Sequence, residues 1–219
     1  MMKGIWGDKK PSGLVYDALD ETCRMLALEE RMFHAACDAL LAGQEPVEDV
    51  AHEDEDINVG ERMVRRMVFE HLTMNPDQDL PASLALVSIV HDVERIGDYS
   101  KSLLELVRWC TVDSGEGRYK DECQQIREMI EPMFGQTLKA LRESDPDLAR
   151  EAMRQHRKVK ARTDEVLEKV METPEVHHDA VLFSVASRFL RRVSAHLSNI
   201  ASSIANPFDK LAEDEAEPG

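Results

Sequence analysis

The chain has 219 residues, of which 42% are hydrophobic but only 5% aromatic, and glycine and proline are scarce. Good helix formers predominate and β-branched runs of strand length are missing, which indicates an all-α protein. The formal net charge of −16 argues against nucleic acid or an anionic membrane surface as a partner, because both are bound by clustered lysine and arginine.

The apolar stretches are too short for membrane insertion. The longest, residues 80–90, has 11 residues including two serines, whereas a span needs about 20. Residues 1–13 contain no apolar segment of the signal-peptide type. The four cysteines show no zinc spacing, and we expect them to be reduced thiols in a cytoplasmic protein. They are Cys23, Cys37, Cys110 and Cys123.

Glycine and proline breakers divide the chain into segments whose apolar residues recur at helical spacing. These segments predict six helices. They lie at about residues 13–42, 47–73, 82–112, 117–143, 146–172 and 175–205. In the first, a broad apolar face is interrupted by Glu29 and Glu30. In the fourth, Pro132 and Gly135 predict a kink or a break.

Helix starts are marked at two positions. Asp145–Pro146 supplies an acceptor side chain followed by proline at the first helical position, and Thr173–Pro174 repeats the pattern. A shift of 97 positions sets residues 96–106 against 193–203, so the six helices form two similar sets of three. We therefore expect two tandem antiparallel three-helix bundles. Their bounds are residues 1–114 and 115–206, followed by an acidic tail at 207–219.

The third predicted helix carries a face with metal-binding potential. His91, Glu94 and Asp98 are spaced i, i+3 and i+7, so they share one side. Glu94 and Asp98 are like charges one turn apart, which destabilises a helix unless they are solvated, paired with arginine or bridged by a cation. Arg95 is the obvious internal partner. On spacing alone, both the arginine-paired state and the metal site remain open.

Two further observations favour a buried position for these carboxylates. Gly97 inside a helix costs about 1 kcal/mol relative to alanine, which suggests close backbone approach by another helix. The neighbouring face is apolar and sets the carboxylates at a seam of the bundle; it consists of Ile89, Val90, Val93 and Ile96. Carboxylates on facing helices commonly hold non-haem metals.

The stretch 92-DVERIGDYSKSLLEL-106 resembles the signature helix of the PhoU family, with its E-R-I-G-D core intact. Tyr99 and Ser102 stand where the family usually has His and Asn. The preceding segment, 54-DEDINVGERMVRRMVFEHL-72, resembles the family's preceding helix.

This resemblance implies a duplicated three-helix bundle without known enzymatic activity, which acts in phosphate homeostasis. It implies contacts with the ATPase subunit of a phosphate transporter, or another phosphate transporter, and with a sensor histidine kinase. We also expect a homodimer. Family members bind multinuclear iron or zinc clusters through E/D-x-x-x-D motifs. Carried over, the metal ligands are Glu94 and Asp98, with Asp54 and Asp92 as supplementary ligands.

The second half departs from the motif. In 191-RRVSAHLSN-199, Arg191 replaces the glutamate and Ala195 the aspartate. His156 then stands opposite Asp54, although the strict shift of 97 would place Glu151 there. Residues 1–111 contain 11 basic and 22 acidic residues, whereas residues 112–208 contain 15 and 16. We therefore predict one metal cluster at most, in the first half.

Other interpretations remain open. A ferritin-like di-metal enzyme would need a second ligand set facing Glu94 and Asp98, and a metal-free structural or adaptor bundle would need only Arg95 as the counter-charge. The basic run at residues 150–162 is a solvated face or a docking surface for an acidic partner, including the acidic half of a second copy.

Overall fold

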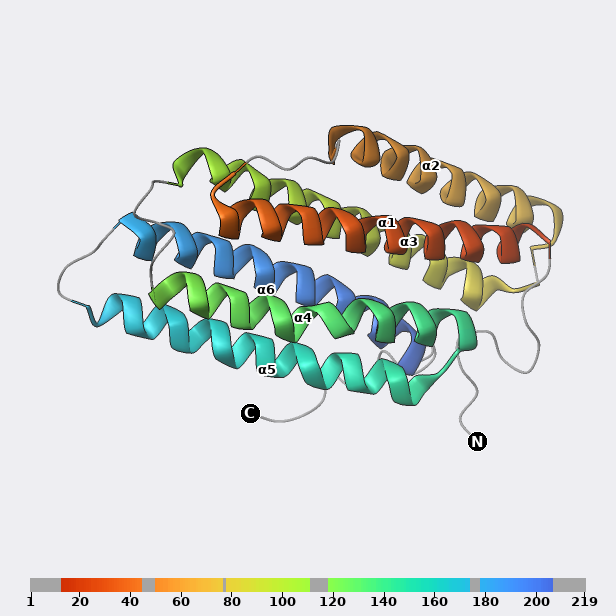
Figure 1. Ribbon diagram of the computed structural model, residues 1–219. Coiled ribbons are helices and arrows are strands. Elements are labelled where there is room, and N and C mark those ends of the chain that lie inside the picture. Colours follow the sequence, from red (N-terminus) through yellow and green to blue (C-terminus); the bar gives the residue numbers. More distant parts are fainter. Residues whose placement is uncertain (1–12, 45–49, 77, 111–117, 174–177, 207–219) are drawn as a thin grey trace.

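The computed structural model describes residues 13–44, 50–76, 78–110, 118–173 and 178–206. Within these ranges it contains helices and connecting turns but no strand, which confirms the all-α prediction. The helices are α1 (Leu14–Ala42), α2 (Val50–Met74), α3 (Leu80–Glu105), a 3-10 turn η1 (Leu106–Trp109), α4 (Arg118–Glu143), α5 (Pro146–Met171) and α6 (His178–Ala205) (Figure 1).

The helix ends follow local signals in the sequence. α1 ends at Gly43, whose φ of 65° is a left-handed conformation that glycine adopts without strain. α5 begins at Asp145, whose Oδ1 accepts hydrogen bonds from the backbone N–H groups of Asp147 and Leu148, at 2.9 and 3.1 Å. The start predicted at Thr173–Pro174 lies partly outside the described residues.

The break predicted in the fourth helix does not occur. α4 runs without interruption from Arg118 to Glu143 with Pro132 inside it. Its neighbours Ile130, Met133 and Phe134 are fully or almost fully buried. Burial of each such side chain contributes about 1.5–3 kcal/mol, which is of the same size as the roughly 3 kcal/mol cost of a proline inside a helix. Tertiary packing therefore holds the helix together across Pro132.

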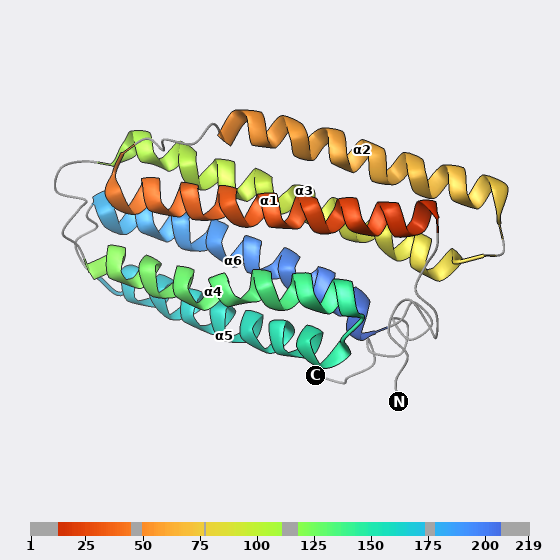
Figure 2. The same ribbon diagram turned by 45° about the vertical axis from the view of Figure 1, so that its right-hand side comes forward.

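The six helices form two three-helix bundles that pack against each other. α1, α2 and α3 contact one another, as do α4, α5 and α6, while α3 packs on α6 and α1 on α4 across the boundary. α2 and α5 lie at opposite outer edges with the other four helices between them (Figures 1 and 2). None of the helices in the described ranges is long and apolar enough to cross a membrane.

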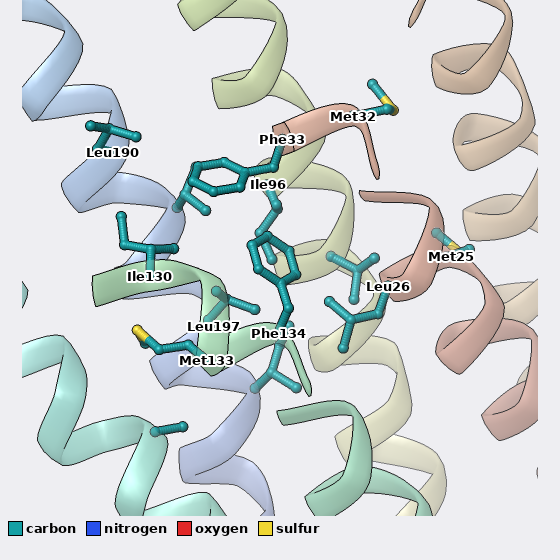
Figure 3. Close-up of a cluster of buried hydrophobic side chains, with 14 of the residues drawn as sticks. Met25, Leu26, Met32, Phe33, Ile96, Ile130, Met133, Phe134, Leu190 and Leu197 are labelled. Carbon is teal, nitrogen blue, oxygen red and sulfur yellow. The ribbon is translucent and has the colours of Figure 1, made fainter. Parts of the chain in front are cut away.

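One hydrophobic core is continuous across both bundles. Phe33 of α1 and Phe134 of α4 meet at its centre, with ring centroids 5.3 Å apart. Side chains from α3 and α6 complete the cluster, among them Ile96 and Leu197 (Figure 3). This core fixes α3 against α6, and so fixes the position of the face that carries the sequence motif.

Candidate metal centre and its counterpart in the second repeat

An acidic cluster lies between the three helices of the first bundle. It consists of Glu29 from α1, Asp54 from α2, and Glu94 and Asp98 from α3. Asp54, Glu94 and Asp98 all act electrostatically on Glu29, which places the four carboxyl groups in one neighbourhood. Three of the four were predicted from the sequence. In the sequence, Glu29 is recognisable only as an interruption of an apolar face.

Two basic side chains neutralise Asp98. The Nζ of Lys101 lies 2.7 Å from Oδ1 of Asp54 and 3.0 Å from Oδ1 of Asp98, so it ties α2 to α3. The guanidinium of Arg95 donates to the other oxygen of Asp98 at 3.2 Å. Burial works to lower the pKa of Lys101, but its hydrogen bonds to Asp54 and Asp98 outweigh that effect and raise it. In this structure the cluster therefore contains a cationic side chain of its own, that of Lys101.

Glu29 is fully buried, and neither of its carboxyl oxygens has a hydrogen-bond partner. Burial raises its pKa well above the usual range, and the neighbouring Asp54 raises it further. The carboxyl group rests on the backbone of Gly97. A Cβ atom at position 97 would lie 2.6 Å from Oε1 of Glu29, far inside van der Waals contact. Another helix does approach closely at Gly97, but the nearest group is the side-chain carboxyl of Glu29 on α1 and not the helix backbone that the sequence predicted.

Glu94 lies at the edge of the cluster, with its side chain 21% exposed. Burial raises the pKa of Glu94, as does the like charge of Asp98, while Arg95 acts in the opposite direction. Its Oε2 is 3.9 Å from Nδ1 of His91 and 3.8 Å from Nε of Arg95. The face predicted from the i, i+3, i+7 spacing is therefore present on α3.

The acidic cluster fits a metal ion in its donor chemistry. Four carboxyl groups from three helices supply only oxygen, which hard and borderline cations favour, and the unpartnered oxygens of Glu29 need a charge or donor to satisfy them. Among the described residues, however, no three acidic, histidine or cysteine side chains are arranged as metal ligands. Lys101 lies between Asp54 and Asp98 and would compete for the same place.

Asp92 lies apart from the acidic cluster. Its Oδ1 is 2.7 Å from Nδ1 of His196 and accepts a hydrogen bond at 3.0 Å from Nδ2 of Asn199, both on α6. Residues two positions apart on a helix point roughly 200° apart, so Asp92 and Glu94 cannot share a face. The structure thus separates Asp92 from the other three predicted ligands and assigns it to the contact between the two bundles.

Tyr99 occupies the first-repeat position that corresponds to His196 under the shift of 97. Its ring stacks on the His196 ring at 5.6 Å and lies 6.1 Å from the ring of Phe189. Phe189 is in turn the counterpart of Asp92. One side of the α3–α6 contact therefore pairs Asp92 with His196, and the other pairs Phe189 with Tyr99. Tyr99 thus packs between the rings of His196 and Phe189.

The counterpart of the acidic cluster in the second repeat is a basic pocket between α5 and α6. Its volume is about 260 Å³. The pocket is lined by His156, Lys160, Arg188, Arg191, Arg192 and Ala195. Glu151 does not line it, which favours the offset pairing of His156 with Asp54 over the strict shift of 97. Nη1 of Arg191 bonds Oδ1 of Asp164 at 2.5 Å. The charge of the site is thus inverted between the two repeats.

Comparisons with known proteins agree with this architecture. The PhoU domain family model matches twice, over residues 22–107 and 124–204. The phosphate-specific transport system accessory protein PhoU homolog of Synechocystis sp. is 26% identical over 200 residues, covering 84% of this chain and 85% of the relative.

Solved structures are also similar. PhoU from Pseudomonas aeruginosa superimposes with a TM-score of 0.74 at 25% identity, covering 86% of this chain and 94% of that one. A second similar structure is that of the phosphate transport system regulatory protein PhoU from Streptococcus pneumoniae. It superimposes with a TM-score of 0.75 at 15% identity, covering 94% of this chain and 98% of that one, and at this identity it supports the fold alone. The two domain matches, each over one three-helix bundle, show that the chain belongs to the PhoU family.

Proposed function

We propose that this protein is a PhoU-type regulator of phosphate uptake that acts in the cytoplasm through protein–protein contacts. The observation that carries the proposal is the match of the PhoU domain to both repeats, together with a relative whose name describes an accessory protein of a phosphate-specific transport system. The partners we propose are the ATPase subunit of a phosphate transporter, or another phosphate transporter, and a sensor histidine kinase. Four free thiols suit a reducing compartment.

The regulatory role is tested by affinity capture of the tagged full-length protein from its own cells after in vivo crosslinking. We expect a phosphate transporter subunit or a histidine kinase among the captured proteins. A strain without the gene should show altered phosphate uptake, restored by the wild-type gene. Capture of neither partner, together with unchanged uptake, would contradict the proposal.

A ferritin-like di-metal enzyme is the weaker alternative. Such a site needs carboxylate or histidine ligands on the helix that faces Glu94 and Asp98. The helices that face Glu94 and Asp98 are α1 and α2, and they present the carboxylates Glu29 and Asp54. The histidine of α6, His196, is directed to Asp92 instead. The site thus lacks the paired carboxylate–histidine motifs of ferritin-like di-metal helices in the part of the chain that the structure describes, and the regulatory proposal involves no catalytic step.

We further propose that the acidic cluster holds one or more metal ions, iron or zinc, with Glu29, Asp54, Glu94 and Asp98 as ligands. Glu29 replaces Asp92 in the predicted ligand set because it is buried beside the motif and has no other partner. A bound metal would crosslink the three helices of the first repeat and supply a positive charge. Lys101 would have to leave Asp54 and Asp98 for it.

The metal proposal is tested by elemental analysis of protein purified without chelators. We expect iron or zinc in the wild type, loss of it in Glu94→Ala/Asp98→Ala, and wild-type content in the control Glu55→Ala/Asp56→Ala, which removes two exposed carboxylates from α2. Lys101→Met should raise the occupancy. The same metal content in wild type and Glu94→Ala/Asp98→Ala, or no metal in wild type and Lys101→Met, would refute the site.

We also propose a homodimer, in line with the sequence-based expectation. Sedimentation equilibrium over a range of concentrations tests it. A mass of one chain, 24.8 kDa, at every concentration would contradict it.

A further inference from the structure

We propose that the basic pocket of the second repeat binds a phosphate-type oxyanion, either inorganic phosphate or the phosphoryl group of a small phosphomonoester. The inference rests on the geometry and charge of the pocket. It does not depend on the regulatory role proposed above.

The pocket is formed because two helices present basic faces to each other. On α6, Arg188, Arg191 and Arg192 are spaced i, i+3 and i+4, so they lie on one side of the helix. On α5, His156 and Lys160 are one turn apart. All five line the same space of about 260 Å³, and Ala195 leaves it open where the first repeat has Asp98.

Within the described residues, the positive charge of the pocket is compensated only in part. Most arginines of this acid-rich chain pair with a carboxylate, but the ion pairs between described residues include none from Arg188, Arg192 or Lys160. One carboxylate, that of Asp164, engages the pocket by bonding Arg191. Three cations of the pocket therefore have no ion-pair partner in the part of the chain that the structure describes, although acidic residues outnumber basic ones by 43 to 27 over the sequence.

The positive potential of the pocket acts on His156. Its ring is half-buried, with Nδ1 2.9 Å from the hydroxyl of Ser194. Burial lowers the pKa of His156, and the positive charges of Arg191, Lys160 and Arg157 lower it further. An anion in the pocket would relieve this repulsion and would offset the mutual repulsion of the arginines.

The size and the donors of the pocket select the class of ligand. Pockets for drug-sized molecules span roughly 300–1,000 Å³, so a space of about 260 Å³ suits a small anion better than a nucleotide. Guanidinium groups present two parallel N–H donors that match two oxygens of a phosphoryl group, and charge-assisted hydrogen bonds of this kind are strong. Three uncompensated cations favour a dianion over a singly charged carboxylate.

The experiment is calorimetric titration of the full chain at constant ionic strength in a phosphate-free buffer. Inorganic phosphate and glycerol 3-phosphate are titrated separately, and acetate is the singly charged control. We expect at least one of the two phosphate ligands to bind, and acetate to bind at least ten-fold more weakly. The tighter of the two phosphate ligands identifies the source of the oxyanion.

Two double variants test whether the anion binds in the basic pocket. Arg188→Gln/Arg192→Gln should weaken binding at least ten-fold, because each lost charge-assisted hydrogen bond typically changes affinity by roughly ten-fold or more. The control Lys139→Gln/Lys158→Gln removes the same charge from residues that do not line the pocket and should change binding less than about two-fold. Circular dichroism melting shows whether both variants remain folded.

Three results would overturn the proposal. The first is no binding of either phosphate ligand to the wild type. The second is equal weakening by both double variants, and the third is acetate binding as tight as phosphate. If Arg188→Gln/Arg192→Gln instead changes only the self-association of the chain, the pocket receives an acidic face of a second copy and the oxyanion assignment is wrong.

Discussion

The contact between Glu29 and Gly97 predicts that Gly97→Ala destabilises the wild-type protein but stabilises a variant that lacks the Glu29 carboxyl group. In an open helix position, Gly→Ala stabilises a protein by about 1 kcal/mol through helix propensity. At position 97 the new methyl group would lie 2.6 Å from Oε1 and 2.8 Å from Oε2 of Glu29. Glu29 is fully buried and has little room to move. Overpacking of this kind typically costs about 1–3 kcal/mol.

We therefore expect Gly97→Ala to lower the free energy of unfolding by about 1 kcal/mol, the difference between a packing cost of about 2 and a propensity gain of about 1 kcal/mol. In the Glu29→Ala background the carboxyl group is absent, so Gly97→Ala should raise the free energy of unfolding by about 1 kcal/mol. The coupling between the two positions is then about 2 kcal/mol, within the range for residues in direct contact.

The assay is urea unfolding followed by circular dichroism, with chelator present so that metal does not contribute. Gly135→Ala is the matched control, because a Cβ there would meet no side chain and no backbone of another element within 4 Å, and Gly135 is exposed. It should stabilise both backgrounds equally, by about 1 kcal/mol. If Gly97→Ala stabilises the wild type as Gly135→Ala does, Glu29 does not pack on Gly97 and the proposed ligand set loses its buried member.

Three further predictions follow from the described contacts. Burial raises the pKa of the Cys110 thiol, which is half-buried, and raises the pKa values of the three buried thiols, Cys23, Cys37 and Cys123, more strongly. Cys110 should therefore be the first to react with a thiol reagent at neutral pH, and the buried thiols should react only on unfolding. Four thiols that react equally fast would contradict this. Asp92→Ala should lower the free energy of unfolding by about 1–3 kcal/mol in urea titrations, because it leaves the ring of His196 and the amide of Asn199 without their shared acceptor. Folding lowers the pKa of His156 from its ordinary value of 6.5. As the pH falls, His156 is therefore protonated in the unfolded chain before it is protonated in the folded protein. Stability should then fall as the pH drops below about 6.5 towards the lowered pKa, and His156→Gln should flatten that dependence in urea titrations at several pH values.

Much of the fold could be predicted from the sequence because its signals are local. Gly43 and Asp145 mark helix ends by their own backbone and side-chain chemistry, and the periodic apolar residues between them define the buried faces. The break at Pro132, one of the two outcomes predicted there, does not occur, because local rules do not include the packing of Ile130, Met133 and Phe134 that holds α4 together.

The candidate site could be predicted only in part. Spacing places Glu94 and Asp98 on one face, and the same rule would have found Lys101, which is three residues after Asp98. It would also have excluded Asp92, two residues before Glu94. Glu29 could not be placed, because its position beside Gly97 depends on how α1 packs on α3 across a long stretch of sequence. The only sign of Glu29 in the sequence is that an acidic residue interrupts the apolar face of the first helix.

The meeting of Phe33 and Phe134 at the centre of the shared core has a consequence for synthesis of the chain. The ribosome completes α1, α2 and α3 before the residues of α4 are translated, so Phe33 is made long before the ring that covers it. Until then the nascent first repeat exposes an apolar surface to solvent. Its folding is finished only when the second repeat has emerged, and during that interval chaperones have a binding surface that the mature protein no longer offers.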